Sequence, residues 1–282
     1  MHKSRVIFTF QCNGDTLILN GSEFGILDYK GIDATDYNLE MQQNVNAMGA
    51  RLKRKQILPR PLEIEFEYRG KDKSSTRQRL IRFFSPFHAG ILIVAYLGVE
   101  RQIKYEVSGA PRFNNKNIYL PLKCLVELEC PDAAFEDNIE ESEAISAWVG
   151  GWSFPFTLPF QLKTKGDPRV NIVNEGHMET PVIVEFHGPA INPYVKNLTT
   201  GKYIKIEAEL GESQILYIDT AFGKKAIEIE EDGVRKDAST MMSYDSRFWN
   251  LQVGDNVIEY GSDNKLQENN VVVRYRNRYL GI

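Results

Sequence analysis

The sequence predicts a mainly β protein in two parts, an N-terminal β-domain that carries one short α-helix and a C-terminal antiparallel β-sandwich. Apolar and polar residues alternate along most of the chain, the alternating runs are short and separated by turn residues, and only one segment has helical periodicity. The 282 residues are 42% hydrophobic and 26% charged, a globular composition that excludes disorder, collagen and coiled coils. A chain of this length favours two domains, each with its own core.

The first half opens with an expected hairpin, whose strands at residues 5–11 and 16–20 flank the turn Asn13-Gly14-Asp15. The next clear strand lies at residues 62–68, where apolar and acidic side chains alternate without a slip. This alternation indicates an antiparallel strand with one face in water, and that face carries Glu63, Glu65 and Glu67. Residues 36–56 are polar and weakly patterned, and further strands are expected at residues 91–97, 102–107 and 120–130.

One short helix interrupts these strands. Ser75-Thr76-Arg77-Gln78 has the pattern of a capping box in which Ser75 is the N-cap. Leu80, Ile81 and Phe84 then fall on one helical face. The helix is expected to stop at Ser85-Pro86, because a residue before proline avoids the helical region. The face turned away from the core carries three basic residues, Arg77, Arg79 and Arg82.

Basic residues concentrate in this part of the chain. Residues 51–82 hold eleven basic and four acidic side chains, a net charge of +7, so the remainder carries −11 of the total of −4. Solvated faces are one interpretation, and a positively charged lumen or intersubunit surface is the other. Opposite charge on the strand with Glu63, Glu65 and Glu67 and on the helix with Arg77, Arg79 and Arg82 suits a head-to-tail contact between copies.

An acidic stretch predicts the domain boundary. Residues 132–143 contain six acidic residues and no basic one, behind Pro131. Such a stretch is typical of a solvated linker or of a short charged helix between domains. The expected organisation is therefore an N-terminal domain at residues 1–131, an acidic linker at residues 132–147 and a C-terminal domain at residues 148–282.

The second half contains many short strands with turn pairs such as Thr200-Gly201, Gly211-Glu212 and Asp232-Gly233 between them. This pattern favours a sandwich or jelly roll over a parallel sheet, and no fixed repeat indicates a solenoid or propeller. The expected strands lie at residues 153–159, 181–187, 203–210, 214–219, 226–230, 256–260 and 271–279.

No pattern of catalytic or ligand-binding residues stands out. The chain has neither a glycine-rich phosphate loop nor a Gly-x-Ser-x-Gly elbow, and its four histidines lack zinc-ligand spacing. Cys124 and Cys130 lie on one strand, roughly 20 Å apart, which is too far for a disulfide or a shared metal. Alternating glutamates indicate solvated sheet faces rather than a glycosidase pair. We therefore expect no enzyme activity, no catalytic residue, no cofactor and no metal.

Features that the sequence lacks predict the cellular compartment of the protein. The chain begins with polar residues and has no apolar signal segment, and its longest apolar run, residues 91–99, is about half a membrane span. Three cysteines do not make a secreted disulfide framework. We expect a soluble protein that is made in a reducing cytoplasm and does not insert into a membrane.

An aromatic cluster raises a second kind of function. Trp152, Phe154 and Phe156 alternate on one expected strand, so their rings share a face. Such a shelf plugs a sandwich core or, less often, stacks sugars. The sugar-platform interpretation makes a lectin-like module for host-surface adhesion the main alternative function.

Several motifs together resemble the distal tail proteins of siphophages. The N-terminal likeness rests on Arg60-Pro61-Leu62-Glu63-Ile64-Glu65-Phe66, the arginine-rich helix, Phe84-Ser85-Pro86 and the hairpin at residues 91–107. The C-terminal likeness rests on five motifs in the family's order, Ile172-Val173-Asn174-Glu175-Gly176 with Thr180-Pro181, Gly188-Pro189 to Asn192-Pro193, Asn197-Leu198-Thr199-Thr200-Gly201, Ile218-Asp219, and Phe248 to Asn256. These are structural motifs, and the likeness covers nearly the whole chain.

The resemblance implies a baseplate hub component of a phage or prophage with a long non-contractile tail. In such proteins the N-terminal domains close into a hexameric ring that continues the tail tube, and the C-terminal domains are similar to galectins or carbohydrate-binding modules. The implied location is the virion tail tip. The implied partners are other copies of the chain, the tail tube protein, a tail-associated hub or lysin protein and receptor-binding proteins, with phage DNA passing through the lumen without specific binding.

Overall fold

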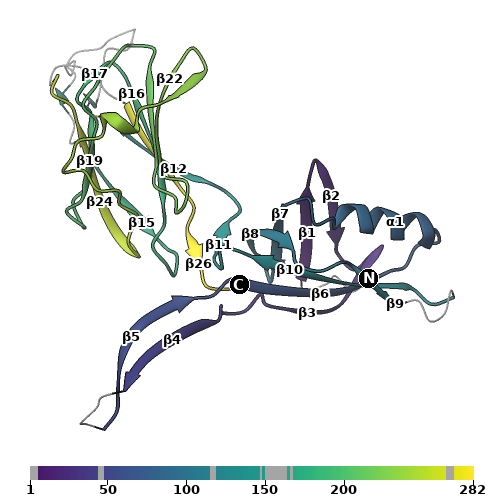
Figure 1. The fold of residues 1–282 in the computed structure, drawn as a ribbon. Helices are drawn as coiled ribbons and strands as arrows, with labels where there is room; N and C mark the ends of the chain where they lie inside the picture. The colour runs from purple at the N-terminus through teal and green to yellow at the C-terminus, as the bar shows by residue number, and fades with distance from the viewer. Residues whose placement is uncertain are drawn as a thin grey trace, which may run out of the picture. The chain divides into compact units, whose positions relative to one another are not determined.

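The computed structural model describes residues 6–43, 48–114, 119–146, 148–149, 164–165, 168–264 and 270–282. The chain divides into two compact units. The first unit comprises Met1–Asn138 together with Tyr279–Ile282, and the second comprises Ile139–Arg278. The second unit is thus inserted, in sequence, just before the last four residues of the first (Figure 1). Among the described residues, the sheets are antiparallel and α1 is the single α-helix, so the mainly β prediction is confirmed.

The first unit is built on one large sheet with the strand order β2-β1-β7-β8-β10-β6-β3. Short strands extend it, with β9 beside β10, β11 beside β8 and β26 beside β11. The bounds are β1 Val6–Cys12, β2 Asp15–Leu19, β3 Phe24–Lys30, β6 Arg60–Tyr68, β7 Gly90–Tyr96, β8 Val99–Val107, β9 Arg112–Asn114, β10 Leu122–Cys130, β11 Phe135–Asp137 and β26 Arg278–Tyr279.

The alternation in β6 predicted its two faces correctly. Leu62, Ile64 and Phe66 are fully buried, whereas the glutamates between them are partly exposed. The core also contains a group of aromatic rings in edge-to-face contact. Phe10 lies at its centre, with ring centroids 5.3 Å from Phe84 and 5.8 Å from Tyr105. Edge-to-face pairs of this kind add specificity to the apolar burial that stabilises the unit.

Helix α1 spans Lys73–Phe83 and differs from the prediction at its start. The N-cap is Asp72, whose carboxylate accepts a 3.0 Å hydrogen bond from the backbone N–H of Ser75. Ser75 therefore lies inside the helix. In the predicted capping box its backbone N–H would have bonded to the Gln78 side chain, whereas here the Asp72 carboxylate accepts that bond. Leu80, Phe83 and Phe84 are buried, whereas Ile81, expected on the buried face, is 39% exposed.

A second sheet of the first unit consists of two strands alone, β4 (Tyr37–Gln43) and β5 (Ala50–Ile57). We name them the hairpin arm. They extend away from the large sheet of their own unit (Figure 1). Every residue of both strands is exposed. The polar, weakly patterned sequence of this segment predicted no element, because neither face of the hairpin is buried within the chain.

The second unit is a sandwich of antiparallel strands. One sheet has the order β12-β25-β16-β21-β22-β23 and the other β15-β24-β18-β19. The bounds are β12 Glu141–Ser146, β15 Arg169–Asn174, β16 Val182–His187, β18 Tyr194–Asn197, β19 Tyr203–Lys205, β21 Ile215–Asp219, β22 Ala226–Glu231, β23 Val234–Asp237, β24 Gly254–Gly261 and β25 Asn270–Tyr275. Two small pairs accompany these sheets, β13 (Trp148–Val149) with β14 (Thr164–Lys165) and β17 (Ala190–Ile191) with β20 (Glu209–Leu210).

Side chains from both sheets meet in the core of this sandwich. Phe186 of β16 contacts Tyr260 of β24 edge to face, with the ring centroids 5.8 Å apart. Val271 and Val273 are fully buried. The one described 3-10 helix, η1, spans Ser239–Met241. The predicted sandwich is confirmed.

The acidic segment at residues 132–147 is not a free linker in this structure. Its β11 pairs with β8, and its β12 pairs with β25 over Glu141–Ser146. The two units divide between Asn138 and Ile139, inside the predicted linker. Phe135 is buried in the core of the first unit and Ile145 in the core of the second, so each strand has one buried apolar residue among its acidic and polar neighbours.

Candidate functional site

The hairpin arm is amphipathic. Tyr37, Leu39 and Met41 share one face of β4, because alternate residues of a strand point the same way. Ile57 and Leu52 of β5 pair with Tyr37 and Met41 and so extend the same face. Tyr37, Met41 and Leu52 are 61%, 54% and 49% exposed. Lys55 is opposite Leu39 on this face, and its ammonium lies 5.8 Å from the centroid of the Tyr37 ring.

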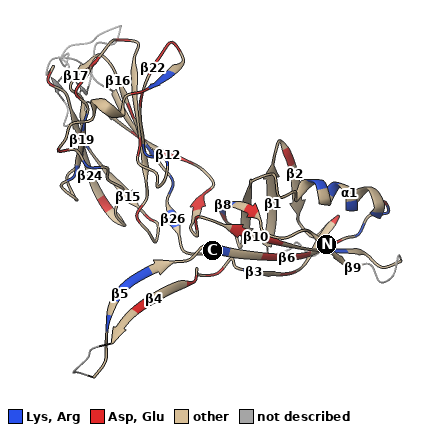
Figure 2. Cartoon of the chain, in the orientation of Figure 1, with Lys and Arg blue, Asp and Glu red and all other residues tan. Residues whose placement is uncertain are grey.

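The opposite face of the hairpin arm is polar and basic. Glu40 pairs with Arg54, and Gln42 pairs with Arg51. A bulge after Glu40 leaves Lys53 without a partner residue across the hairpin, and its ammonium forms a 2.8 Å ion pair with the Glu40 carboxylate. The blue segments of β5 in Figure 2 mark these basic residues. The arm therefore presents one mainly apolar surface, which also carries Lys55, and one positively charged surface.

The structure brings Glu63, Glu65 and Glu67 together on the outer face of β6, as predicted. Two of them are paired within the unit, Glu63 with Lys30 at 2.8 Å and Glu67 with Arg69 at 2.9 Å. Across the sheet, Glu63 is directly opposite Glu127. Like charges in this position repel.

Neighbouring strands enlarge the acidic surface. Glu129 of β10 is directly opposite Glu106 of β8, a second like-charge pair. Sequence reasoning missed Glu106, Glu127 and Glu129 because only strand pairing places β10 beside β6 and β8 beside β10. The alternation of Glu127 and Glu129 with Val126 and Leu128 indicated that these glutamates lie on the outer face of their strand. It could not indicate which strands lie on either side.

The three predicted helix arginines are exposed on α1. Arg77 lies over Phe113, with its guanidinium carbon 4.9 Å from the ring centroid. Arg79 donates a 3.4 Å hydrogen bond to the carbonyl oxygen of Thr16. Arg82 is in the last turn of the helix, where the helix dipole stabilises a positive charge. Their grouping on one helix is visible in Figure 2. Part of their role is thus structural within the unit.

The aromatic residues of the sugar-platform prediction, Trp152, Phe154 and Phe156, lie outside the described residues. A different polar surface exists on β16, β25 and β21 of the second unit. Arg274 forms a 2.9 Å ion pair with Glu185, which raises the pKa of Arg274, and Arg235 lies 3.7 Å from the ring centroid of Tyr217. These charged groups satisfy one another rather than leaving a set of convergent, unpaired groups.

The motifs of the second unit hold loops in shape. The amide of Asn256 donates to the carbonyl oxygens of Gln252 and Gly254 at 2.7 and 2.8 Å and accepts from the N–H of Gln252 at 2.8 Å. Asn174 does the same for its own turn, donating to Met178 O and accepting from Gly176 N, both at 2.9 Å. Both asparagines are buried. They satisfy backbone groups that turns leave unpaired.

The described residues give no sign of a metal centre. No three His, Cys, Asp or Glu side chains within that part of the chain lie close enough to hold a metal ion. The three cysteines are free and buried, and burial raises the pKa of the Cys124 and Cys130 thiols to about 12. No α-helix of the described segments has the length and apolar character that a membrane crossing requires.

Comparison with known proteins gives one matching family. Residues 175–279 match the family described as the siphovirus-type tail component, C-terminal domain. No curated protein matches the chain.

Solved structures are similar over nearly the full length. The Dit protein (gp 19.1) of phage SPP1, described as a paradigm of hub adsorption apparatus in phages that infect Gram-positive bacteria, has a TM-score of 0.67 at 11% identity, with 95% of this chain and 98% of that chain covered. A chain of the phage P2 baseplate in its activated conformation with Ca has a TM-score of 0.57 at 8% identity, with 96% and 98% covered. The predicted resemblance to siphophage distal tail proteins is confirmed.

Proposed function

We propose that this chain, whose second unit matches the siphovirus tail component family and whose fold is that of phage hub proteins, is a structural component of a phage or prophage tail tip. It forms a hexameric ring that joins the tail tube of a long non-contractile tail to the host-recognition apparatus. The observation that carries the proposal is the exposed apolar face of the hairpin arm on a hub-protein fold.

The hairpin arm supports assembly because it has little to stabilise it alone. Isolated two-stranded hairpins are marginally stable in water. Apolar side chains gathered on one face gain roughly 25 cal/mol for each Å² that a partner covers. A second copy of the chain is the partner that a ring supplies at every arm. We therefore assign the face with Tyr37, Leu39 and Met41 to the contact between neighbouring copies.

Charge supports a directional contact. Each copy has an acidic face around Glu63, Glu65 and Glu67, a basic helix with Arg77, Arg79 and Arg82, and a basic face on the arm. Contacts between different surfaces of identical chains are head-to-tail, and such contacts close into a ring when the rotation permits. Rim charges of this kind set register and salt sensitivity more than affinity.

The remaining partners follow from a position in the tail. The proposed ring contacts the tail tube protein on one side and a hub or tail-associated lysin protein on the other, and receptor-binding proteins attach to it during host adsorption. Phage DNA passes through the lumen without specific binding. The chain itself has no enzymatic role and is located at the virion tail tip.

Mass measurement of the full chain tests the proposal, by light scattering and negative-stain imaging across a concentration series. The wild-type chain should form six-fold rings at high concentration. Met41→Asn should weaken assembly by about ten-fold, because it removes apolar contact area at one position of the face. Gln42→Asn is the matched control on the opposite face and should assemble like wild type. Three-fold or ring-free particles in a reconstruction of the tail tip would overturn the proposal.

A lectin-like role of the second unit is the alternative. It is suggested by the aromatic residues Trp152, Phe154 and Phe156, which lie on an expected strand of a sandwich unit. Calorimetric titration of the full chain with host cell-wall glycans distinguishes the two. Millimolar or tighter binding that disappears in Trp152→Ala supports the alternative, and no binding to any glycan contradicts it.

A further inference from the structure

The chain returns to its first unit after completing the second. Residues 279–282, which we name the returning segment, belong to the first unit. Tyr279 is buried in the core of that unit, and Ile282 packs against the same core. Figure 1 shows the end of the chain beside the start of β6, where β5 of the hairpin arm leads into the large sheet.

The returning segment forms backbone hydrogen bonds with residues 31–36, which connect β3 to the arm. The backbone N–H of Thr35 donates to the carbonyl oxygen of Leu280, and the N–H of Ile282 donates to the carbonyl oxygen of Ile32, both at 3.0 Å. Gly281 lies between these bonds. A Cβ atom at Gly281 would be 2.7 Å from the carbonyl carbon and oxygen of Asp33, so only glycine permits this approach.

Arg60 joins the returning segment to both sides of the arm's base. It follows β5 by three residues, it is 2% exposed, and burial lowers the pKa of its guanidinium. Its Nη1 donates to Gly31 O and, at 2.6 Å, to Asp33 O, and its Nη2 donates to Leu280 O. Its Nε donates to Ala133 O at 2.8 Å. A buried cation must be hydrogen bonded, and here backbone carbonyls meet that requirement.

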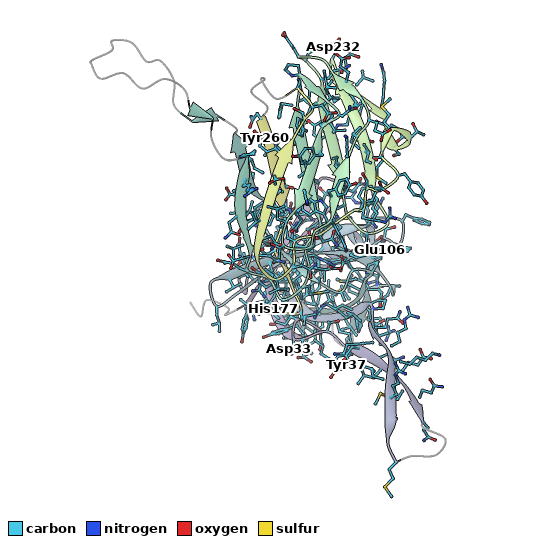
Figure 3. All side chains as sticks on the ribbon, turned by 90° about the vertical axis from the view of Figure 1, so that its left-hand side faces the viewer. Asp33, Tyr37, Glu106, His177, Asp232 and Tyr260 are labelled. Carbon is cyan, nitrogen blue, oxygen red and sulfur yellow. The ribbon has the colours of Figure 1, made fainter. Side chains whose placement is uncertain are left out.

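The two roots of the hairpin arm are therefore fixed by the same few contacts. Residues 31–36 lead into β4, residues 58–60 follow β5, and the N–H of Leu58 donates to Asp36 O at 3.1 Å across them. Asp33 and Tyr37, labelled in Figure 3, mark the path from this base into the arm. On the far side, Arg101 of β8 donates to Gly281 O and so holds the returning segment against the sheet.

We propose that the returning segment is a clasp that fixes the base of the hairpin arm, and that the arm is set for its contact with a neighbouring copy only in a chain translated and folded through residue 282. The assembly part of this inference rests on the proposed function. A strand of seven residues such as β4 spans roughly 23 Å, so a tilt of about 10° at its base moves its far end by about 4 Å, enough to break an apolar contact.

The clasp links assembly to completion of the second unit. The first 138 residues include β1 to β11, but the clasp residues follow the whole of the second unit in the chain. A chain interrupted in the second unit thus has an arm whose base lacks the bonds from Leu280 and Ile282. Incomplete chains are excluded from the ring by this arrangement.

Gly281→Ala in the full chain tests the clasp, because its methyl group must displace the backbone of residues 33 and 34. Hydrogen exchange should be about ten-fold faster at the amides of Thr35, Leu58 and Ile282, and unchanged in β16 and β25. Ring formation should fall by about ten-fold. Gly211→Ala is the matched control, since the nearest atom to its Cβ would be 3.7 Å away, and it should change neither measurement.

The outcomes separate the two proposals. Gly281→Ala with wild-type exchange at Thr35 overturns the clasp, and faster exchange with undiminished rings overturns its role in assembly. Arg60→Lys provides a second variant, because one ammonium cannot replace a guanidinium that bonds four carbonyls, and it should reproduce both effects. A wild-type chain that never assembles overturns the proposed function and the assembly role, whereas exchange at the base still decides whether the clasp exists.

Discussion

The guanidinium of Arg101 stacks on the ring of Tyr279, with its Cζ atom 3.5 Å from the ring centroid. Arg101 lies on β8, and Tyr279 follows the entire second unit in the chain. The Tyr279 hydroxyl donates a 3.3 Å hydrogen bond to the Asp137 carboxylate, just before the chain leaves the first unit. The pair therefore closes the first unit at the point where the second is inserted.

Arg101→Ala should lower the free energy of unfolding of the first unit by about 2 kcal/mol, the size of a desolvated cation–π contact. It also removes the hydrogen bond to Gly281 O. Urea unfolding followed by the fluorescence of the full chain measures the change. Lys104→Ala, an exposed position on the same strand, should change it by less than about 0.5 kcal/mol. Equal losses would show that the stack contributes nothing.

Asp72→Ala should destabilise α1 by about 1 kcal/mol, because the N–H of Ser75 loses its cap. Asp72→Asn retains an acceptor at the same position and should keep most of that stability. Thermal unfolding monitored by circular dichroism compares the two. Ser75→Ala should have little effect, and a larger loss there than at Asp72 would restore Ser75 as the cap.

Val273→Thr should destabilise the second unit by about 1–3 kcal/mol, because it buries a hydroxyl in the sandwich core. Val272→Thr is the matched control on the opposite face of β25, where the side chain is only partly buried. Differential scanning calorimetry should show a clear fall in Tm for the first variant alone. Similar falls in both would contradict the assignment of the two faces.

Thiol reactivity should follow burial and pKa. The pKa values of Cys124 and Cys130 rise from 9.0 to about 12, so both thiols remain protonated in the folded chain at pH 8. The unfolded chain loses these protons near pH 9, so folded stability falls as the pH rises from about 9 towards 12. A thiol-reactive dye should label the native chain slowly and all three cysteines quickly in urea. Rapid native labelling of Cys124 would contradict this.

Residues 139–278 should fold alone, because the ends of this unit lie side by side, with Glu141 paired to Tyr275. Residues 1–138 should need residues 279–282 joined by a short linker, since Tyr279 belongs to their core. Protease resistance and thermal unfolding of the three fragments test this division. Full stability of residues 1–138 alone would show that the returning segment is dispensable to the first unit.

Local pattern was enough to predict several features. The alternation of Leu62, Ile64 and Phe66 with glutamates specified both the strand and its buried face, because the period of side chains in a strand is two. Short strands and turn residues likewise predicted the sandwich of the second unit. Elsewhere a strong local signal was misleading. The strand expected at residues 271–279 ends at Tyr275, and Arg278, whose place in a regular strand would be on the face opposite Val273, is buried.

The sequence by itself determined the mainly β fold and the faces of the long strands, since each depends on neighbours within a few residues. Only the tertiary structure decided the hairpin arm, the acidic surface shared by β6, β10 and β8, and the clasp of residues 279–282. Neither face of the arm is buried within the chain, so its sequence does not need the alternation of apolar and polar residues that predicts a strand. The clasp joins Arg60 to Leu280 through backbone carbonyls, which every residue possesses and which no sequence pattern can therefore reveal.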